Sequence, residues 1–173
     1  MIRLLNEEPT PSETSMIRRL LSEAFEGDFS HADWEHTCGG IRFLGIEDDE
    51  VISHGAVITR RIWIDGNEHQ VGYVEGIAVT PKHWRKGLGS KLMMELTSYC
   101  AENFSISLLS TGEKEFYSRF GWREFTGKSF VKEGDEIVRT GEDDDSLMYL
   151  LGRVTITEPL QEFICEIRSG DPW

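Results

Sequence analysis

The stretch from Gly72 to Met94 reads GYVEGIAVTPKHWRKGLGSKLMM. Apolar side chains alternate with period two as far as Val79, which predicts a strand, and Pro81 ends that strand. The apolar spacing after Leu88 is typical of a helix start. A basic turn with two glycines lies between the two elements, so the stretch is interpreted as a strand, a turn and a helix.

The turn from Arg85 to Ser90, RKGLGS, is suited to bind a phosphate. A glycine turn that leads into a helix presents free backbone N–H groups and the positive end of the helix dipole. Residues 80–94 hold several lysines and arginines and no acid, although the chain has 18 basic and 31 acidic residues. The alternative is a solvated helix start, because such turns are common. The order of strand, turn and helix favours a nucleotide-bearing cofactor.

Glu75 is the residue of the strand that suggests chemistry, because Tyr73, Ile77 and Val79 on the same face are apolar. Burial disfavours the charged form of a carboxyl group and raises its pKa, which makes it a better base. A glutamate in a strand can equally face solvent. Gly76, which follows it, predicts a bulge or a close backbone approach.

The composition bounds the class of protein. A chain of 173 residues with 39% hydrophobic and 28% charged residues predicts a single domain over residues 1–173. No apolar run reaches the roughly 20 residues of a membrane span, and the N-terminus does not resemble a signal peptide. Three separated cysteines and the histidine spacing indicate neither a disulfide framework nor a metal site. We therefore expect a cytoplasmic protein without a metal.

The net charge of −13 bears on partners. It disfavours nucleic acid, whose phosphates require a positive surface. It favours a small cationic substrate if the acids gather near a pocket, whereas acids spread over the surface would only keep the protein soluble.

Periodicity and turn signals give the order of elements. Strands are expected over Met1 to Leu5, Ile41 to Ile46, Val51 to Ile64, Glu68 to Thr80, Phe104 to Leu109 and Leu147 to Thr157, with another at Gly121. Helices are expected from Thr10 until Gly27, after Ser30, over Leu88 to Ala101 and over Glu113 to Phe120. Gly127 to Gly141 is interpreted as a polar loop, and Glu158 to Arg168 as irregular or strand-like. The pattern predicts an α+β fold with a mixed sheet.

The glycine stretch resembles motif A of the GCN5-related N-acetyltransferase superfamily, in the spacing from Pro81 to Gly87, Leu88 and Gly89. This resemblance implies an acyl-CoA N-acyltransferase fold: a mostly antiparallel sheet whose central parallel strands splay, flanked by helices. It also implies that the turn holds the pyrophosphate of acetyl-CoA. One departure is Trp84, because the superfamily usually has Arg or Gln there.

Other segments resemble a subgroup, the aminoglycoside 2'-N-acetyltransferases, from about Arg18 to the last residue. The segments that carry this resemblance are EGDFSHADWEHT (26–37), GG (39–40), GYVEG (72–76), FYSRFGW (116–122), DDD (143–145) and RSGDPW (168–173). Two differences accompany them. The chain is two residues shorter between Leu109 and Tyr117, and Gly127 to Gly141 diverges from the family.

The resemblance implies roles for particular residues. The aminoglycoside site would be lined by Asp28, Asp33, Glu75, Gly76, Ser110, Asp144, Asp171 and Trp173 with its terminal carboxylate. Acetyl-CoA would be held by the backbone of Ile77, Ala78 and Val79 and by the turn, Trp84, Arg85, Lys86, Gly87, Leu88, Gly89 and Ser90. Glu75 would be the base, acting through water, and Tyr117 the acid. A homodimer is an expectation of the same resemblance.

These roles suit the chemistry. An amine is protonated at neutral pH and must lose a proton before it attacks a thioester. A tyrosine, with a pKa of about 10 in water, can protonate the departing thiolate. A polycationic amino-sugar requires several carboxylates as charge-assisted acceptors.

The alternatives are structural: Asp33 as a helix charge, Tyr117 as core packing, residues 143–145 as an exposed turn and a disordered terminal tryptophan. At the level of function, the alternatives are acetylation of another cationic amine, such as a polyamine, an amino-sugar metabolite or another antibiotic, and a non-catalytic module that binds acyl-CoA or an antibiotic.

Overall fold

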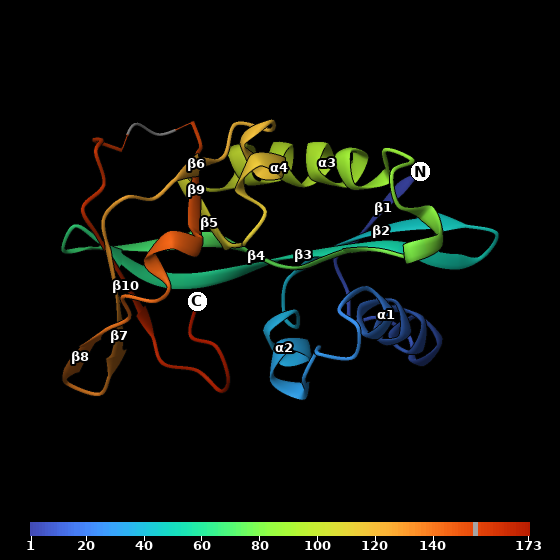
Figure 1. The fold of residues 1–173 in the computed structure, drawn as a ribbon, viewed down its shortest axis with the longest axis horizontal. Helices are drawn as coiled ribbons and strands as arrows, with labels where there is room; N and C mark the ends of the chain where they lie inside the picture. The colour runs from blue at the N-terminus through green and yellow to red at the C-terminus, as the bar shows by residue number, and fades with distance from the viewer. Residues whose placement is uncertain (154–155) are drawn as a thin grey trace. The chain divides into compact units, whose positions relative to one another are not determined.

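The computed structural model describes residues 1–153 and 156–173 (Figure 1). Its internal contacts divide the chain into two compact units. The first comprises residues 1–58 and 74–98, and the second residues 59–73 and 99–173. The expectation of a single acetyltransferase domain stays a prediction.

The first unit begins with a short strand and two helices and continues with the central strands. Its elements, three of which extend into the second unit, are β1 (Ile2–Leu5), α1 (Pro11–Ala24), α2 (His31–His36), β2 (Ile41–Glu47), β3 (Glu50–Ile64), β4 (Asn67–Val79), the 3-10 turn η1 (Pro81–His83) and α3 (Leu88–Asn103). β1 pairs with β2 and β2 with β3, both antiparallel. The predicted meander and the predicted helix after the glycine turn are confirmed.

Local sequence determines where the first two helices start. Thr10 and Glu13 form a capping box at the N-terminus of α1, and Ser30 and Asp33 form another at the N-terminus of α2. In each box the side-chain oxygen of the first residue accepts a hydrogen bond from the backbone N–H of the acid, which would otherwise lack a partner. The carboxylate of the acid in turn accepts a hydrogen bond from the backbone N–H of the first residue. Both helix starts were predicted.

The helices lie on opposite faces of the sheet in the first unit: α1 and α2 cover one face and α3 the other (Figure 1). The apolar face of α1, with Ile17, Leu20 and Leu21, packs in one cluster with Trp34 of α2 and with strand residues that include Leu44. Because both faces of β3 are covered, its run from Val51 to Val57 is entirely buried. Such a run is typical of a central strand.

The second unit contains the ends of β3 and β4, the C-terminal end of α3 and a set of short elements. These are β5 (Ile106–Ser110), α4 (Lys114–Ser118), β6 (Arg123–Glu124), β7 (Lys128–Glu133), β8 (Glu136–Arg139), the 3-10 turn η2 (Asp144–Ser146), β9 (Leu147–Leu151) and β10 (Glu162–Glu166). The strand order is β6-β9-β5-β4-β3-β10-β7-β8. β4 pairs with β5 in parallel through Gly72 and Tyr73, as the helix between them predicts.

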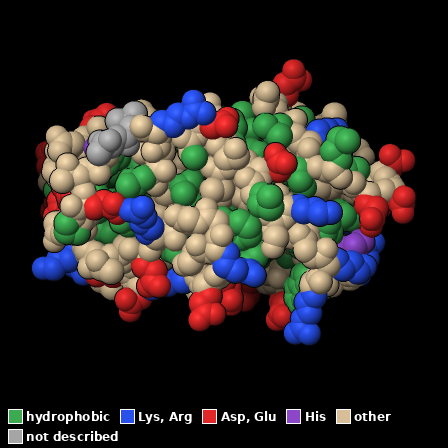
Figure 2. Space-filling view, turned by 90° about the horizontal axis from the view of Figure 1, so that it is seen from above, with side chains coloured by type: hydrophobic (Ala, Val, Ile, Leu, Met, Phe, Trp, Pro, Cys, Tyr) green, Lys and Arg blue, Asp and Glu red, His purple; other side chains and the backbone are tan. Residues whose placement is uncertain are grey.

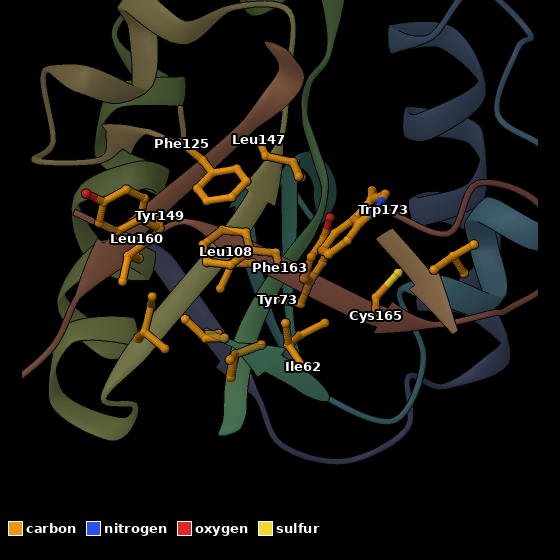
Figure 3. Close-up of a cluster of buried hydrophobic side chains, with 14 residues drawn as sticks. Ile62, Tyr73, Leu108, Phe125, Leu147, Tyr149, Leu160, Phe163, Cys165 and Trp173 are labelled. Carbon is orange, nitrogen blue, oxygen red and sulfur yellow. The ribbon is translucent and has the colours of Figure 1, made fainter. Parts of the chain in front are cut away.

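The core of the second unit is a cluster of buried side chains on these strands (Figure 3). Phe125 stacks on Phe163 at a centroid distance of 3.8 Å, and Tyr149 meets Phe163 edge to face. Trp173, the last residue, belongs to this cluster and is 3% exposed. The alternative of a disordered terminal tryptophan is therefore wrong.

Two element predictions are corrected. Residues 127–141, expected to be a polar loop, form the antiparallel hairpin of β7 and β8, and β7 pairs in parallel with β10. The polar Ser129 can be buried in β7 because its hydroxyl has polar partners, with the carbonyl oxygen of Thr140 at 2.8 Å and Asp144 Oδ1 at 2.7 Å. A buried serine interrupts the apolar alternation that would have predicted a strand. The strand expected from Leu147 to Thr157 ends at Leu151, and residues 154–155 lie outside the described residues.

Charged side chains of both signs are interspersed on the face shown in Figure 2. Among the described residues, no helix is long and apolar enough to cross a membrane.

Candidate active site

The turn between β4 and α3 has the geometry of an anion site. Arg85 and Gly87 have positive φ angles of 61° and 79°, so the turn winds tightly before α3 begins at Leu88. The first N–H groups of a helix have no intrahelical partner. Lys86 lies exposed in the same turn. A turn of this shape and charge fits a phosphate group.

Trp84 has a positioning role in this turn. Its indole Nε1 donates a 2.7 Å hydrogen bond to the carbonyl of Val79, the last residue of β4. His83 connects Thr80 Oγ1, at 2.8 Å, to Glu47 Oε2, also at 2.8 Å. Trp84, which replaces the usual Arg or Gln of the superfamily, therefore ties the turn to the end of β4 through its indole N–H.

The extended geometry of β4 has a break at Gly76, immediately after Glu75, although the strand continues to Val79. Its φ of 60° is a conformation that favours glycine, and a Cβ there would lie 3.0 Å from Thr37 Cγ2 and 3.3 Å from the ring of His54. The predicted close backbone approach is confirmed. The break leaves Glu75 half-buried, between the buried part of the strand and the turn.

A buried polar network supports this break, and sequence reasoning missed it. His54 Nδ1 lies 2.7 Å from the carbonyl oxygen of Gly76, and Nε2 lies 2.9 Å from Arg42 Nη1. Burial, the largest cause, lowers the pKa of His54 to about 3. The hydrogen bond that the Gly76 carbonyl accepts from His54 opposes this shift, and the positive charge of Arg42 adds to it. The sequence contained a signal for this network, because Arg42 and His54 each lie within an otherwise mostly apolar strand.

The acids of the α1–α2 region have different surroundings. Asp33 Oδ2 accepts the backbone N–H of Ser30 at 2.7 Å, so the carboxylate caps α2, as the structural alternative for this residue proposed. Asp28 is exposed in the preceding loop. Thr37, the C-terminal cap of α2, lies against Gly76 of β4.

In the second unit, the end of β5 meets the turn η2. Ser110 Oγ donates to Ser146 Oγ at 2.8 Å, and the N–H of Thr111 donates to the carbonyl of Ser146 at 2.8 Å. Tyr117 lies on α4. Burial raises the pKa of Tyr117 to about 12; a hydrogen bond with Thr111 opposes the rise and the charge of Glu113 adds to it. The phenol therefore keeps its proton throughout the neutral range.

Asp144 is engaged within the protein. Its Oδ1 accepts from the backbone N–H of Ser129 at 2.8 Å, from Ser129 Oγ at 2.7 Å and from Arg139 Nη1 at 2.8 Å, and its Oδ2 pairs with Arg139 Nη2. Burial opposes ionisation, but these donors together keep the pKa of Asp144 below its ordinary value. The side chain holds η2 against the β7–β8 hairpin.

Asp143, which belongs to the DDD segment but was assigned no role in the site, has the opposite character. Burial raises its pKa, and the neighbouring charges of Asp171, Glu142 and Asp144 raise it further. Asp171 and Asp143 are thus close enough to repel each other. A carboxylate pair of this kind is suited to a cationic ligand.

The C-terminal tail is held in place by arginines. Arg168 donates through Nε to the carbonyl of Asp171 at 2.7 Å and through Nη2 to the terminal Trp173 O at 3.0 Å. Arg60 Nη2 donates to the carbonyl of Pro172 at 2.7 Å. The tail is therefore an ordered part of the second unit.

The predicted site residues thus fall into two groups. In the second unit, four of them lie on or beside η2 and the C-terminal tail: Ser110, Asp144, Asp171 and Trp173. Tyr117 is linked to this group by a hydrogen bond with Thr111, the residue after Ser110. The first unit places Glu75 and Gly76 on the strand that ends at the glycine turn. Within the described ranges, no group of three or more His, Cys, Asp or Glu side chains is arranged to hold a metal ion.

The fold and the turn define an N-acyltransferase. Residues 7–125 match the family model described as an acetyltransferase (GNAT) domain, which is more than half of the chain. The chain belongs to this family, and its predicted fold class is confirmed.

Known proteins refine this placement. The aminoglycoside 2'-N-acetyltransferase of Mycolicibacterium fortuitum is 33% identical over 178 residues, covering 99% of this chain and 91% of that protein. The resemblance to that subgroup is therefore confirmed. A GNAT family N-acetyltransferase, YhbS, from Escherichia coli, solved in complex with CoA, superposes with a TM-score of 0.68 at 18% identity, over 95% of this chain and 88% of that one.

Larger members of the fold match over part of their length. A GCN5-related N-acetyltransferase from Kribbella flavida superposes with a TM-score of 0.59 at 22% identity, over 74% of this chain but only 35% of that one. Such low identity supports the shared fold alone.

Proposed function

We propose that this protein transfers the acetyl group of acetyl-CoA to the 2'-amine of an aminoglycoside. The observation that carries the proposal is the 33% identity, over 99% of the chain, to an enzyme named for that reaction. Expectations of a cytoplasmic location and of a homodimer belong to the same proposal.

The turn supplies the binding site for the cosubstrate. Backbone N–H groups of Gly87 to Ser90 and the charges of Arg85 and Lys86 receive the phosphates, and the backbone of Ile77 to Val79 lies along the remainder of acetyl-CoA. The exposure of the turn and its positive φ angles at Arg85 and Gly87 support this assignment.

Two residues of the chain move protons in the proposed reaction. Glu75 takes a proton from the substrate ammonium through a water molecule, and the free amine attacks the thioester carbonyl. The carbon–sulfur bond then breaks, and Tyr117 gives its phenolic proton to the thiolate. The attacking nitrogen loses its second proton, which passes through solvent and restores the phenol of Tyr117. The raised pKa of Tyr117 supports the acid role, because the group is fully protonated near neutral pH.

Carboxylates recognise the acceptor. We propose that the amines of a polycationic sugar are bound by Asp28, Asp33, Asp144, Asp171 and the terminal carboxylate of Trp173, and that Gly76 and Ser110 also contact the sugar. Charge-assisted hydrogen bonds are roughly twice as strong as neutral ones, so several carboxylates give selectivity for such a substrate.

A thiol-release assay tests the proposal. The purified protein is mixed with acetyl-CoA and a panel of aminoglycosides with and without a 2'-amine, and the acetylated nitrogen is located by NMR. We expect thiol release only with 2'-amino acceptors. Release only with polyamines such as spermidine would point to another amine, and binding by calorimetry without any release would indicate a non-catalytic module.

A further inference from the structure

The carbonyl group of Gly76 is bonded by a side chain of another strand. His54, on β3, has no exposed surface, and its Nδ1 lies 2.7 Å from Gly76 O. Glycine can populate φ angles of both signs with similar ease, so the sequence alone does not fix the observed φ of 60°. The contact with His54 favours this conformation, because it fixes the direction of the Gly76 carbonyl.

The direction of each hydrogen bond in this network follows from chemistry. Arginine has only donors, so Arg42 Nη1 donates to Nε2 of His54, which must be the unprotonated nitrogen. Nδ1 therefore carries the proton and donates it to the Gly76 carbonyl. Only the neutral ring with this tautomer satisfies both neighbours.

Arg42 is itself fixed by α2. Its Nη1 also donates to Thr37 Oγ1 at 3.0 Å, its Nη2 lies 3.5 Å from Cys38 Sγ, and its guanidinium lies over the Trp34 ring at 4.9 Å from the centroid. The hydroxyl of Thr37 donates to the carbonyl of Trp34 at 2.8 Å. The network is thus anchored at the end of the helix that contacts Gly76.

We propose that Arg42 and His54 are positioning residues for acetyl transfer, which hold the peptide group between Gly76 and Ile77, and with it Glu75, in the reactive conformation. This proposal rests on the proposed function, in which Glu75 is the base and the Ile77 backbone contacts acetyl-CoA.

Two physical effects follow from the geometry. A donor on the Gly76 carbonyl polarises the peptide group, which makes the N–H of Ile77 a stronger donor. The same bond keeps the backbone after Glu75 in one conformation, and a displacement of about 1 Å at a catalytic group can cost roughly 100-fold in rate. Neither effect touches the glycine turn that is proposed to hold the phosphates.

The test compares His54→Leu, His54→Asn and the control Ser53→Ala, a buried residue of the same strand. Leucine removes the donor, whereas asparagine keeps an N–H near the position of Nδ1. We expect kcat to fall roughly 10- to 100-fold in His54→Leu. The KM and the calorimetric Kd for acetyl-CoA should rise by much less, about twofold to threefold, because only the Ile77 N–H is weakened and the phosphate turn is intact. His54→Asn should recover most of kcat, and Ser53→Ala should match the wild type.

The outcomes separate the two proposals. If the wild-type protein acetylates no amine, the proposed function fails and the positioning role with it. If the wild type is active and a folded His54→Leu variant has the same kcat, only the positioning role fails.

A second measurement does not depend on activity or on a variant that folds. Nitrogen-15 NMR of the wild-type protein between pH 5 and pH 8 should show His54 protonated at Nδ1 alone. A proton on Nε2, or titration within that range, would overturn the hydrogen-bond directions and the proposal.

Discussion

The indole Nε1 of Trp173 donates a 3.0 Å hydrogen bond to Thr140 Oγ1, and this hydroxyl in turn donates to Ser129 Oγ at 2.9 Å. The last residue of the chain is thereby joined to the β7–β8 hairpin, with its ring beside Phe163 in the core (Figure 3). A buried aromatic ring of this size contributes substantially to stability.

Trp173→Ala is therefore expected to lower the free energy of unfolding by about 3–5 kcal/mol, because it leaves a cavity and removes the hydrogen bond from the indole to Thr140. Urea denaturation followed by circular dichroism measures the change. Ile167→Ala, at a residue of the same segment that is 50% exposed, is the control and should stay within about 0.5 kcal/mol of wild type. A loss below about 1 kcal/mol for Trp173→Ala would contradict the packing.

The catalytic roles predict that Glu75→Gln and Tyr117→Phe each lower kcat. The amide has nearly the volume of the carboxylate but does not accept a proton from an ammonium ion, so a fall of about 10²- to 10⁴-fold is expected. Tyr117→Phe should cost about 10²-fold, because the thiolate then leaves without an internal acid. Steady-state kinetics and calorimetry with acetyl-CoA distinguish these effects from lost binding, since Kd should not change.

Elements determined by neighbouring residues were predictable from the sequence. The strand, turn and helix around Gly87 and the capping box of Ser30 are local patterns, and the structure confirms them. Burial of Ser129 was not predictable, because its partners are 11 and 15 residues away, at Thr140 and Asp144. The hydrogen bond between Arg42 and His54, which are 12 residues apart, was not predictable for the same reason: it forms only when β2 pairs with β3.

Stability should depend on pH through His54. Burial lowers its pKa to about 3 from the ordinary value of 6.5. Below pH 6.5 the unfolded chain therefore takes up a proton that the folded chain does not bind. This stabilising contribution is complete above pH 6.5 and is lost as the pH falls toward 3, at up to about 1.4 kcal/mol per pH unit.

Urea denaturation at pH 7, 6 and 5 measures this slope. His54→Asn is the comparison, because it removes the titrating group and keeps a donor, and the difference between the two slopes isolates His54. A hydrogen bond from Arg3 lowers the pKa of Glu13 to about 2. Glu13 therefore loses its stabilising contribution only below its ordinary pKa of 4.5, outside this range. Equal slopes for both proteins would refute the prediction.

Acceptor binding should depend more on Asp143 than on its neighbour Asp145. Asp144 is already paired with Arg139, whereas burial and the charge of Asp171 raise the pKa of Asp143. A bound ammonium group relieves that repulsion. Asp143→Asn should therefore raise the KM for the acceptor roughly tenfold or more, the cost of one charge-assisted hydrogen bond, while Asp145→Asn, at an exposed position, leaves it unchanged.

Proton linkage gives an independent measurement of the same relationship. Because a cation lowers the pKa of Asp143 on binding, the wild-type protein should release protons into a weakly acidic buffer when it binds the acceptor, and Asp143→Asn should release fewer. Calorimetry in two buffers of different ionisation enthalpy counts these protons. Identical release by the two proteins would mean that the acceptor amines bind elsewhere in the second unit, and Asp171→Asn would then be the variant to compare.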